Sequence, residues 1–189
     1  MTELEQYVHA CFGATEKDMT DIASLFKPEV LKKGEFFLKA GTFCDNVCFI
    51  QSGFLRLFVA TEDKEVTQWI ASKGFFLADL ASLTFRTPAR FNIQALTDTE
   101  LHTIRREDYN RIGERVEKWP EIEKHFLVNY FIMMENRIFT HLSMPAEERY
   151  GFFFQQNKEL FNQVPLQYIA SMLGMTPETF SRIRKKQLG

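Results

Sequence analysis

The chain has 189 residues, of which 45% are hydrophobic and 25% charged, and its formal net charge is −2. This composition excludes collagen, low-complexity sequence and a disordered tail, and the chain is long enough to bury a core of its own. The first twenty residues lack the basic start and apolar run of a signal peptide, and no apolar stretch is long enough to span a membrane. We therefore expect a cytoplasmic globular protein with no part in the membrane.

Residues 1 to about 27 are predicted to be helical. Apolar side chains recur at helical spacing in two runs, the first formed by Leu4, Tyr7, Val8 and Cys11 and the second by Met19, Ile22, Ala23 and Phe26. Gly13 separates the two runs, and Pro28 is expected to end the second helix.

Between residues 30 and 103 the pattern changes to that of short strands. The apolar stretches are VLKKGEFFLKAG, NVCFIQSGFLRLFVA, VTQWIASKGFF, RFNIQAL and ELHTI, and they are separated by glycines at tight turns. The segment TEDKE, residues 61–65, is typical of a hairpin tip. Many short strands at this spacing predict an antiparallel roll or barrel whose strands are joined mainly by hairpins.

No strand signal returns after Arg105, and a helix of about 24 residues is predicted from Pro120 onward. It carries a heptad-like apolar seam of Leu127, Phe131, Met134 and Ile138, and beside it a second apolar row of Ile122, Phe126, Tyr130 and Met133. If one row faces the roll, the other needs a second copy of the chain, so we expect a homodimer. The alternative is that both rows are covered within one chain.

The C-terminal region predicts several shorter helices. Pro145 ends the long helix, residues 147–156 form another, and the segment up to Pro165 is expected to be a loop. Two short helices follow, residues 166–173 and 177–187, with Gly174 in the turn, Thr176 as N-cap and Pro177 at the first helical position. The first is expected to bury Ile169, Ala170 and Leu173, and the second Phe180 and Ile183. Together they form a helix–turn–helix.

The outward side of the second helix has the residue types that contact DNA. The candidate DNA-binding residues are Thr176, Pro177, Glu178, Thr179, Ser181, Arg182, Lys185 and Lys186. Four basic residues and one acidic residue give residues 166–189 a charge of +3, which leaves −5 for the rest of the chain. This asymmetry favours a nucleic-acid partner, although a solvated helical hairpin would show a similar pattern.

The segment IASMLGMTPETFSRIRKK resembles the recognition motif of the Crp/Fnr superfamily of bacterial transcription regulators. LKKGEFFLKAG and FIQSGFLRLF, with Gly34, Gly41 and Gly53, resemble the cyclic nucleotide-binding domain of that family. The resemblance implies an α+β fold with an N-terminal antiparallel β-roll sensor and its helices (1–116), a dimerisation helix (117–144) and a helix–turn–helix domain (145–189). It implies a homodimer bound to an inverted repeat in double-stranded DNA, with RNA polymerase as a further partner. A β-wing after the second helix is expected to be missing or short.

The resemblance places a ligand pocket at Ala78, Asp79, Leu80, Ala89 and Arg90, where the family has a phosphate-binding cassette. Ala78 replaces the usual glycine of the family, and Arg90 stands one residue later than the usual arginine. These departures weaken phosphate capture, so we expect an effector other than cyclic AMP, or none. The alternative is that the roll binds no ligand and has an apolar interior packed by Phe75, Phe76, Phe85 and Phe91.

Enzyme chemistry is not predicted. The roll contains one histidine, His102, which argues against a cupin-like metal centre, and no catalytic triad, P-loop or dinucleotide glycine motif is present. Cys11, Cys44 and Cys48 are too few for a four-thiolate site and are expected to be idle thiols. The rival hypothesis is a sensor module that acts on a protein partner without binding DNA.

Overall fold

A computed structural model of the chain describes residues 16–188. The predicted helix at residues 4–11 and Cys11 lie outside these residues. The first described element is α2 (Glu16–Ala23), whose Met19 and Ile22 are buried against the roll. The helix ends earlier than the sequence predicted, and Pro28 lies inside a strand rather than marking a helix end. Because this strand pairs on one side only, a residue without a backbone N–H is tolerated there.

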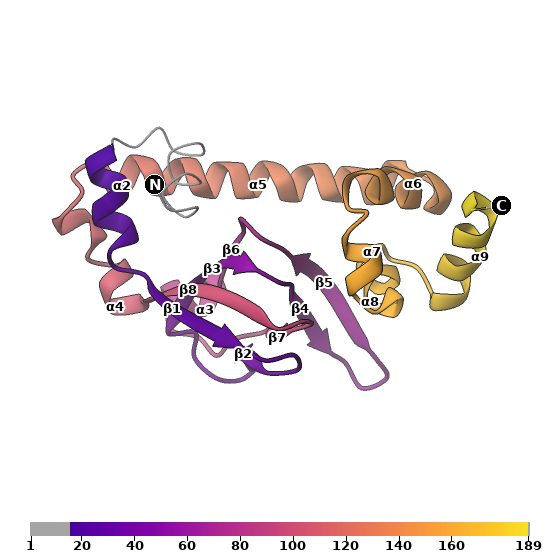
Figure 1. Ribbon diagram of the computed structural model, residues 1–189, viewed down its shortest axis with the longest axis horizontal. Helices are drawn as coiled ribbons and strands as arrows, with labels where there is room; N and C mark the ends of the chain where they lie inside the picture. Colours follow the sequence, from indigo (N-terminus) through magenta and orange to yellow (C-terminus); the bar gives the residue numbers. More distant parts are fainter. Residues whose placement is uncertain (1–15, 189) are drawn as a thin grey trace.

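The predicted antiparallel β-roll is confirmed, and it lies beneath the long helix (Figure 1). Its eight strands form two four-stranded sheets, in the orders β1-β8-β3-β6 and β2-β7-β4-β5. The strands are β1 (Lys27–Leu31), β2 (Phe36–Leu38), β3 (Asn46–Ser52), β4 (Leu55–Ala60), β5 (Glu65–Ala71), β6 (Phe76–Leu77), β7 (Asn92–Ala95) and β8 (Thr99–Arg105).

The expectation that hairpins join most of these strands is wrong. Within the described residues only β4 and β5 are consecutive neighbours in a sheet, and residues 61–64 form their tip. The other pairs join strands distant in sequence, such as β1 with β8 and β2 with β7. Apolar periodicity identifies a strand but carries no information about its partner, which depends on how the two sheets close over a common core.

The core of the roll lies between the two sheets. Ile50 from β3, Leu55 from β4, Ile93 from β7 and Leu101 from β8 are almost completely buried there. Between β6 and β7 the chain forms α3 (Leu80–Phe85), a helix that the sequence pattern did not predict. After β8 follow the short helices α4 (Arg106–Tyr109) and η1 (Ile112–Glu114).

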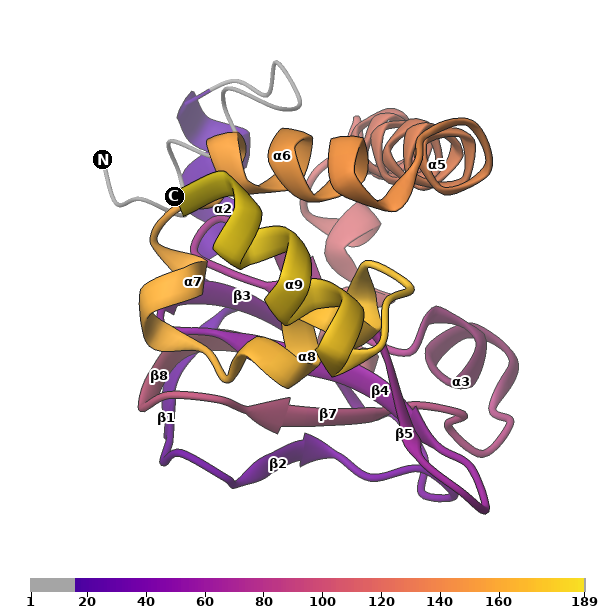
Figure 2. The same cartoon turned by 90° about the vertical axis from the view of Figure 1, so that its right-hand side faces the viewer.

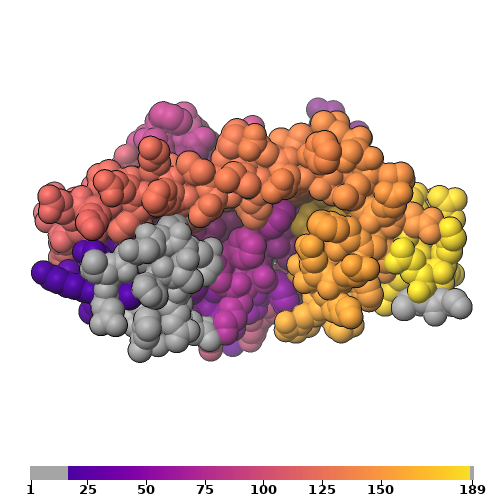
Figure 3. Space-filling model, turned by 90° about the horizontal axis from the view of Figure 1, so that it is seen from above, coloured from indigo at the N-terminus to yellow at the C-terminus, as the bar shows by residue number. Residues whose placement is uncertain are grey.

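The predicted long helix is confirmed as α5 (Trp119–Ser143), with Pro120 in its first turn. It runs along the length of the molecule as a ridge when seen from above (Figure 3). Its Ile122 is buried, and the Phe126 ring contacts the Phe76 ring of the roll edge to face, with centroids 5.6 Å apart. One of the two predicted apolar rows therefore faces the roll of the same chain.

Four helices form the C-terminal end, namely α6 (Ala146–Gln156), α7 (Leu160–Gln163), α8 (Leu166–Met172) and α9 (Pro177–Leu188). The segment expected to be a loop before Pro165 contains α7, because Leu160, Phe161 and Val164 turn into a second hydrophobic core. No helix of the described part of the chain is long and apolar enough to cross a membrane.

Candidate functional site

The helix–turn–helix geometry at residues 166–188 agrees with the sequence signals that predicted it. Gly174 follows α8 with a φ of +68°, a left-handed conformation in which a side chain would be strained. The Thr179 backbone N–H donates to the Thr176 Oγ1 at 3.2 Å, so Thr176 caps the N-terminus of α9 as predicted. Figure 2 shows α9 in front of α8 at this end of the molecule.

The inward sides of the two helices form a closed apolar contact. Ile169, Ala170 and Leu173 of the first helix and its turn, and Phe180 and Ile183 of α9, are buried as predicted. The Phe180 ring meets the ring of Tyr150 from α6 edge to face, with centroids 5.2 Å apart. This packing fixes the rotation of α9 about its axis and therefore determines which of its residues face solvent.

The outward side of α9 presents most of the candidate DNA-binding residues together. Pro177, Glu178, Ser181, Arg182 and Lys185 line one open hollow on the surface, and all five are exposed. Thr176 is also exposed at the start of the helix, whereas Thr179 is half-buried. The spacing of three or four residues along the helix places Glu178, Arg182 and Lys185 on one face.

Lys186 differs from the other candidates because it has a partner inside the protein. Its Nζ lies 2.8 Å from the Glu147 Oε1 on α6, and both side chains are largely open to solvent. An exposed pair of this kind stabilises the fold by less than about 1 kcal/mol. It turns Lys186 toward α6 and away from the hollow that Lys185 lines.

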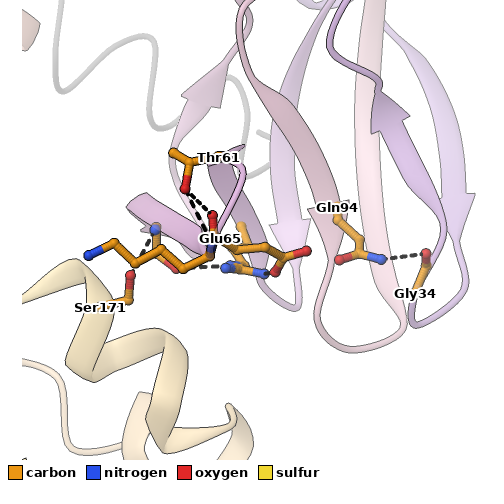
Figure 4. Close-up of polar contacts among 8 residues, drawn as sticks. Gly34, Thr61, Glu65, Gln94 and Ser171 are labelled. Carbon is orange, nitrogen blue, oxygen red and sulfur yellow. Dashed lines mark hydrogen bonds and ion pairs between the residues drawn. The ribbon is translucent and has the colours of Figure 1, made fainter. Parts of the chain in front are cut away.

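The helix–turn–helix is docked on the roll, a relationship that sequence reasoning missed. The Thr67 backbone N–H of β5 donates to the Ser171 Oγ of α8 at 2.9 Å. Figure 4 shows Ser171 reaching the β4–β5 hairpin that carries Thr61 and Glu65. Three roll residues, Phe54, Ile70 and Leu96, belong to the same hydrophobic core as α8 and α9.

Arg56 of β4 lies at the centre of this junction and is 1% exposed. Its Nε donates to the Thr67 Oγ1 at 2.9 Å, and it forms an ion pair with Glu65 at 2.6 Å. Its guanidinium also lies over the rings of Phe58 and Tyr168. The sequence signal for this role was a lone arginine within the apolar run of residues 54–59. A continuous apolar run indicates a strand covered on both faces, so an arginine inside it is expected to be buried.

The apolar seam predicted on α5 is open to solvent in the single chain. Leu127, Phe131 and Ile138 are 43%, 62% and 60% exposed, and Met134 is half-buried. Several further apolar side chains on the same helix are exposed, among them Val128, Ile132, Phe139 and Leu142. An apolar surface of this extent on one helix is typical of an interface between proteins.

At the predicted ligand cassette the Asp79 carboxylate is buried and occupied by the backbone. Its Oδ1 accepts the Ser82 N–H at 3.0 Å and so caps α3, and its Oδ2 accepts the N–H of Arg90 at 3.0 Å and of Phe91 at 3.4 Å. These three backbone donors occupy three of the roughly four lone-pair positions of an ionised carboxylate. Asp79 therefore ties the loop between α3 and β7 to the N-terminus of α3.

The other four cassette residues differ in their exposure to solvent. Ala89 is buried and exchanges backbone hydrogen bonds with the turn at 41–42, while Arg90 is exposed and its guanidinium lies over its neighbour Phe91. Ala78 is half-buried and Leu80 exposed, and both border a small apolar cavity beneath α5. Of the four aromatics expected to fill the roll, Phe85 is instead 75% exposed, because it lies on the outer side of α3.

Two cysteines lie among the described residues, and neither is exposed. Cys44 and Cys48 are buried free thiols, and burial raises the pKa of both. Among residues 16–188 no cluster of three or more His, Cys, Asp or Glu side chains is placed to hold a metal ion.

Comparisons with known proteins agree with this fold. The family model of the cyclic nucleotide-binding domain matches residues 28–115, which cover the roll. Among solved structures, FixK2 from Bradyrhizobium japonicum has a TM-score of 0.70 at 16% identity, covering 85% of this chain and 83% of that one. A CooA variant from Carboxydothermus hydrogenoformans has a TM-score of 0.63 at 21% identity, covering 89% and 79%.

The catabolite activator protein of Thermus thermophilus has a TM-score of 0.56 at 19% identity, covering 95% of this chain and 85% of that one. These neighbours are Crp/Fnr-type regulators rather than enzymes, and the chain shares their fold. A comparison with curated proteins finds no match.

Proposed function

We propose that this chain is a DNA-binding transcription regulator of the Crp/Fnr type that acts as a homodimer. The observation that carries the proposal is the face of α9, where Glu178, Arg182 and Lys185 are exposed together on a helix fixed from behind by Phe180 and Ile183. A capped helix that is apolar on one side and basic and polar on the other suits insertion into the major groove.

The residues of α9 divide by role. Arg182 and Glu178 lie one turn apart, where guanidinium and carboxylate groups reach base edges, guanine for the first and cytosine for the second. Thr176, Pro177, Thr179 and Ser181 stand toward the N-terminal end, where the hydroxyl groups of the two threonines and the serine meet phosphates. Lys185 contacts phosphate farther along, and Lys186 does so only after releasing Glu147.

The proposed dimer forms along α5. Burying Leu127, Phe131 and Ile138 against a second copy would remove the largest exposed apolar side chains of the seam from water. A parallel two-fold pair of chains presents two α9 helices to successive major grooves, roughly 34 Å apart, so the operator is an inverted repeat. Contact with RNA polymerase belongs to the same proposal.

We propose that the roll does not bind cyclic AMP at the cassette. The phosphate of a cyclic nucleotide needs free backbone donors and a guanidinium in the cassette. Asp79 already holds the N–H groups of Ser82, Arg90 and Phe91, and the Arg90 side chain lies outside on Phe91. An effector of this protein is therefore expected to bind elsewhere.

Selection of binding sequences from random duplex DNA tests the proposed function. The expected result is an inverted repeat whose affinity for the protein falls steeply as salt rises, because basic side chains displace counterions from phosphates. Absence of retardation of any selected or random duplex at low salt would overturn it. That outcome would favour a sensor module that acts on a protein partner.

A further inference from the structure

A cavity of about 200 Å³ lies where the roll, the long helix and the helix–turn–helix meet. It is bordered by β5, α5, α6 and the C-terminal end of α8. The lining residues that matter here are Trp69, Arg137, His141, Arg149, Phe152 and Phe153. None of the residues of the described chain that line it is acidic. The cavity is separate from the cassette at residues 78–90.

Arg137 brings a positive charge into this cavity without a negative partner. Its guanidinium donates to the Gln68 carbonyl of β5 and, at 3.0 Å, to the Met172 carbonyl of α8. No carboxylate of the described residues forms an ion pair with it, and burial lowers its pKa. A guanidinium has five N–H donors, so three remain after these two contacts.

Arg149 of α6 contacts the Leu173 carbonyl, next along the chain from the Met172 carbonyl that Arg137 contacts. Its Nε donates to the Leu173 carbonyl at 2.9 Å, and one terminal nitrogen donates to the carbonyls of His141 and Met144. The second terminal nitrogen keeps both of its donors. The two arginines hold the carbonyls of adjacent residues, the last residue of α8 and its C-cap, and both line the cavity with donors to spare.

Trp69 adds an unsatisfied donor on the same wall. Its indole Nε1 is buried and has no hydrogen-bond acceptor among the described residues, an arrangement that destabilises the fold unless a water molecule or a ligand supplies one. The guanidinium of Arg137 lies 5.1 Å from the centroid of its ring. Phe152 and Phe153 of α6 supply further aromatic surface. The cavity thus combines donors that lack an acceptor with flat apolar walls.

We propose that this cavity is an effector site for a small organic anion, a flat ring that carries one carboxylate. The carboxylate takes the spare donors of Arg137 and Arg149, because two oxygens match the fork of a guanidinium. The ring lies against Trp69 and the phenylalanines of α6. Pockets for drug-sized ligands measure about 300–1,000 Å³, so this smaller cavity selects a compact ligand over a nucleotide.

Binding would act on the helix–turn–helix through α8. The anion would bind the remaining donors of the two guanidinium groups that hold the Met172 and Leu173 carbonyls, directly before the turn at Gly174. The anion therefore changes how firmly α8 is held on α5 and α6. This consequence rests on the proposed function, whereas binding itself does not.

The test uses the two tryptophans of the chain, Trp69 and Trp119, as internal reporters. Benzoate and indole-3-carboxylate are titrated into the full-length protein while the indole N–H signals are followed by nuclear magnetic resonance. Benzamide, the neutral relative of benzoate, and inorganic phosphate are titrated in parallel. The expected result is a saturable shift of the Trp69 signal by a carboxylate, with the Trp119 signal unchanged and with benzamide and phosphate without effect.

Two variants make the result specific. Arg149→Lys keeps the charge but loses the fork, and it should weaken binding at least about tenfold. Asn136 is exposed and lines the cavity, so Asn136→Trp should fill the space and abolish binding while the protein stays folded. Wild-type affinity in either folded variant would overturn the assignment of the site.

The proposal also fails if neither carboxylate shifts Trp69 up to about 10 mM, a concentration that detects even millimolar complexes, or if phosphate binds as well as benzoate. The titration contains no DNA, so its failure is distinguishable from a failure of the proposed function.

Discussion

The guanidinium of Arg56 lies over the ring of Tyr168, with 3.7 Å between its central carbon and the ring centroid. Arg56 belongs to the roll and Tyr168 to α8, so this contact joins the roll to the C-terminal helices across more than a hundred residues of sequence. We expect a double-mutant cycle of Arg56→Met and Tyr168→Leu to give a coupling free energy of about 1 kcal/mol in urea unfolding.

The matched control for this cycle is the pair Lys39 and Phe36, whose cation–ring distance is 5.2 Å and whose side chains are exposed at the surface. Its coupling should be below about 0.5 kcal/mol, because water screens it. Equal coupling in the two cycles would contradict a role for Arg56 in holding the two parts together.

Glycines at turns should differ in their tolerance of alanine according to φ and to the available space. Gly174→Ala should lower the free energy of unfolding by about 1–2 kcal/mol, since the backbone is left-handed but the new Cβ meets its nearest neighbour at 3.6 Å. Gly53→Ala should lower the free energy of unfolding further than Gly174→Ala does, because the new Cβ would lie 2.6 Å from the Thr99 Oγ1. Gly113→Ala, without either problem, should change stability by less than about 0.5 kcal/mol. The order is checked by thermal unfolding of the three variants, and a Gly113 variant as unstable as the Gly53 variant would be inconsistent with it.

Asp79 should behave as a structural residue. Asp79→Ala removes the acceptor of three backbone N–H groups and should destabilise the protein by about 2–3 kcal/mol in urea unfolding. Arg90→Ala, at an exposed position, should be nearly neutral. A stabilisation of the wild type by cyclic AMP that Arg90→Ala abolishes would show instead that the cassette binds the nucleotide.

The contrast between the cassette and the helix–turn–helix shows what the sequence could predict. The roles of Gly174 and Thr176 depend on residues within one or two turns, so local signals were sufficient. The role of Asp79 depends on the loop of residues 86–91 folding back onto it, which no local pattern reveals.

Long-range pairing accounts for the other errors and omissions. The contact between Ser171 and Thr67 spans 104 residues, and β8 lies between β1 and β3, so the hairpin prediction failed. The segment of α7 has only four helical residues, too few for a period to be visible, and it is helical because Leu160 and Phe161 enter the core of the C-terminal end.

The seam on α5 should hold two copies of the chain together. Phe131→Glu would place facing carboxylates in an apolar interface, which costs several kcal/mol per charge. Sedimentation at micromolar concentration should therefore show a monomer. Asn129→Glu provides the control, because Asn129 is exposed on roughly the opposite side of the helix and its variant should remain dimeric. A Phe131→Glu protein that stays fully dimeric would exclude this seam as the interface.

The central claim is that α9 reads DNA, and binding of Arg182→Ala and Lys185→Ala to a selected operator and to random duplex across a salt series tests it most directly. Both residues are exposed on the same face of α9, so the two variants are matched in stability. Arg182→Ala should cost about 1–3 kcal/mol per half-site and relax the preference at one base pair. Lys185→Ala should weaken binding to operator and to random duplex about equally. The slope of the logarithm of the binding constant against the logarithm of the salt concentration should become less steep by roughly one unit for each phosphate that is no longer neutralised. If Arg182→Ala lowers both affinities equally and leaves the base preference intact, the assignment of base recognition to this face is wrong.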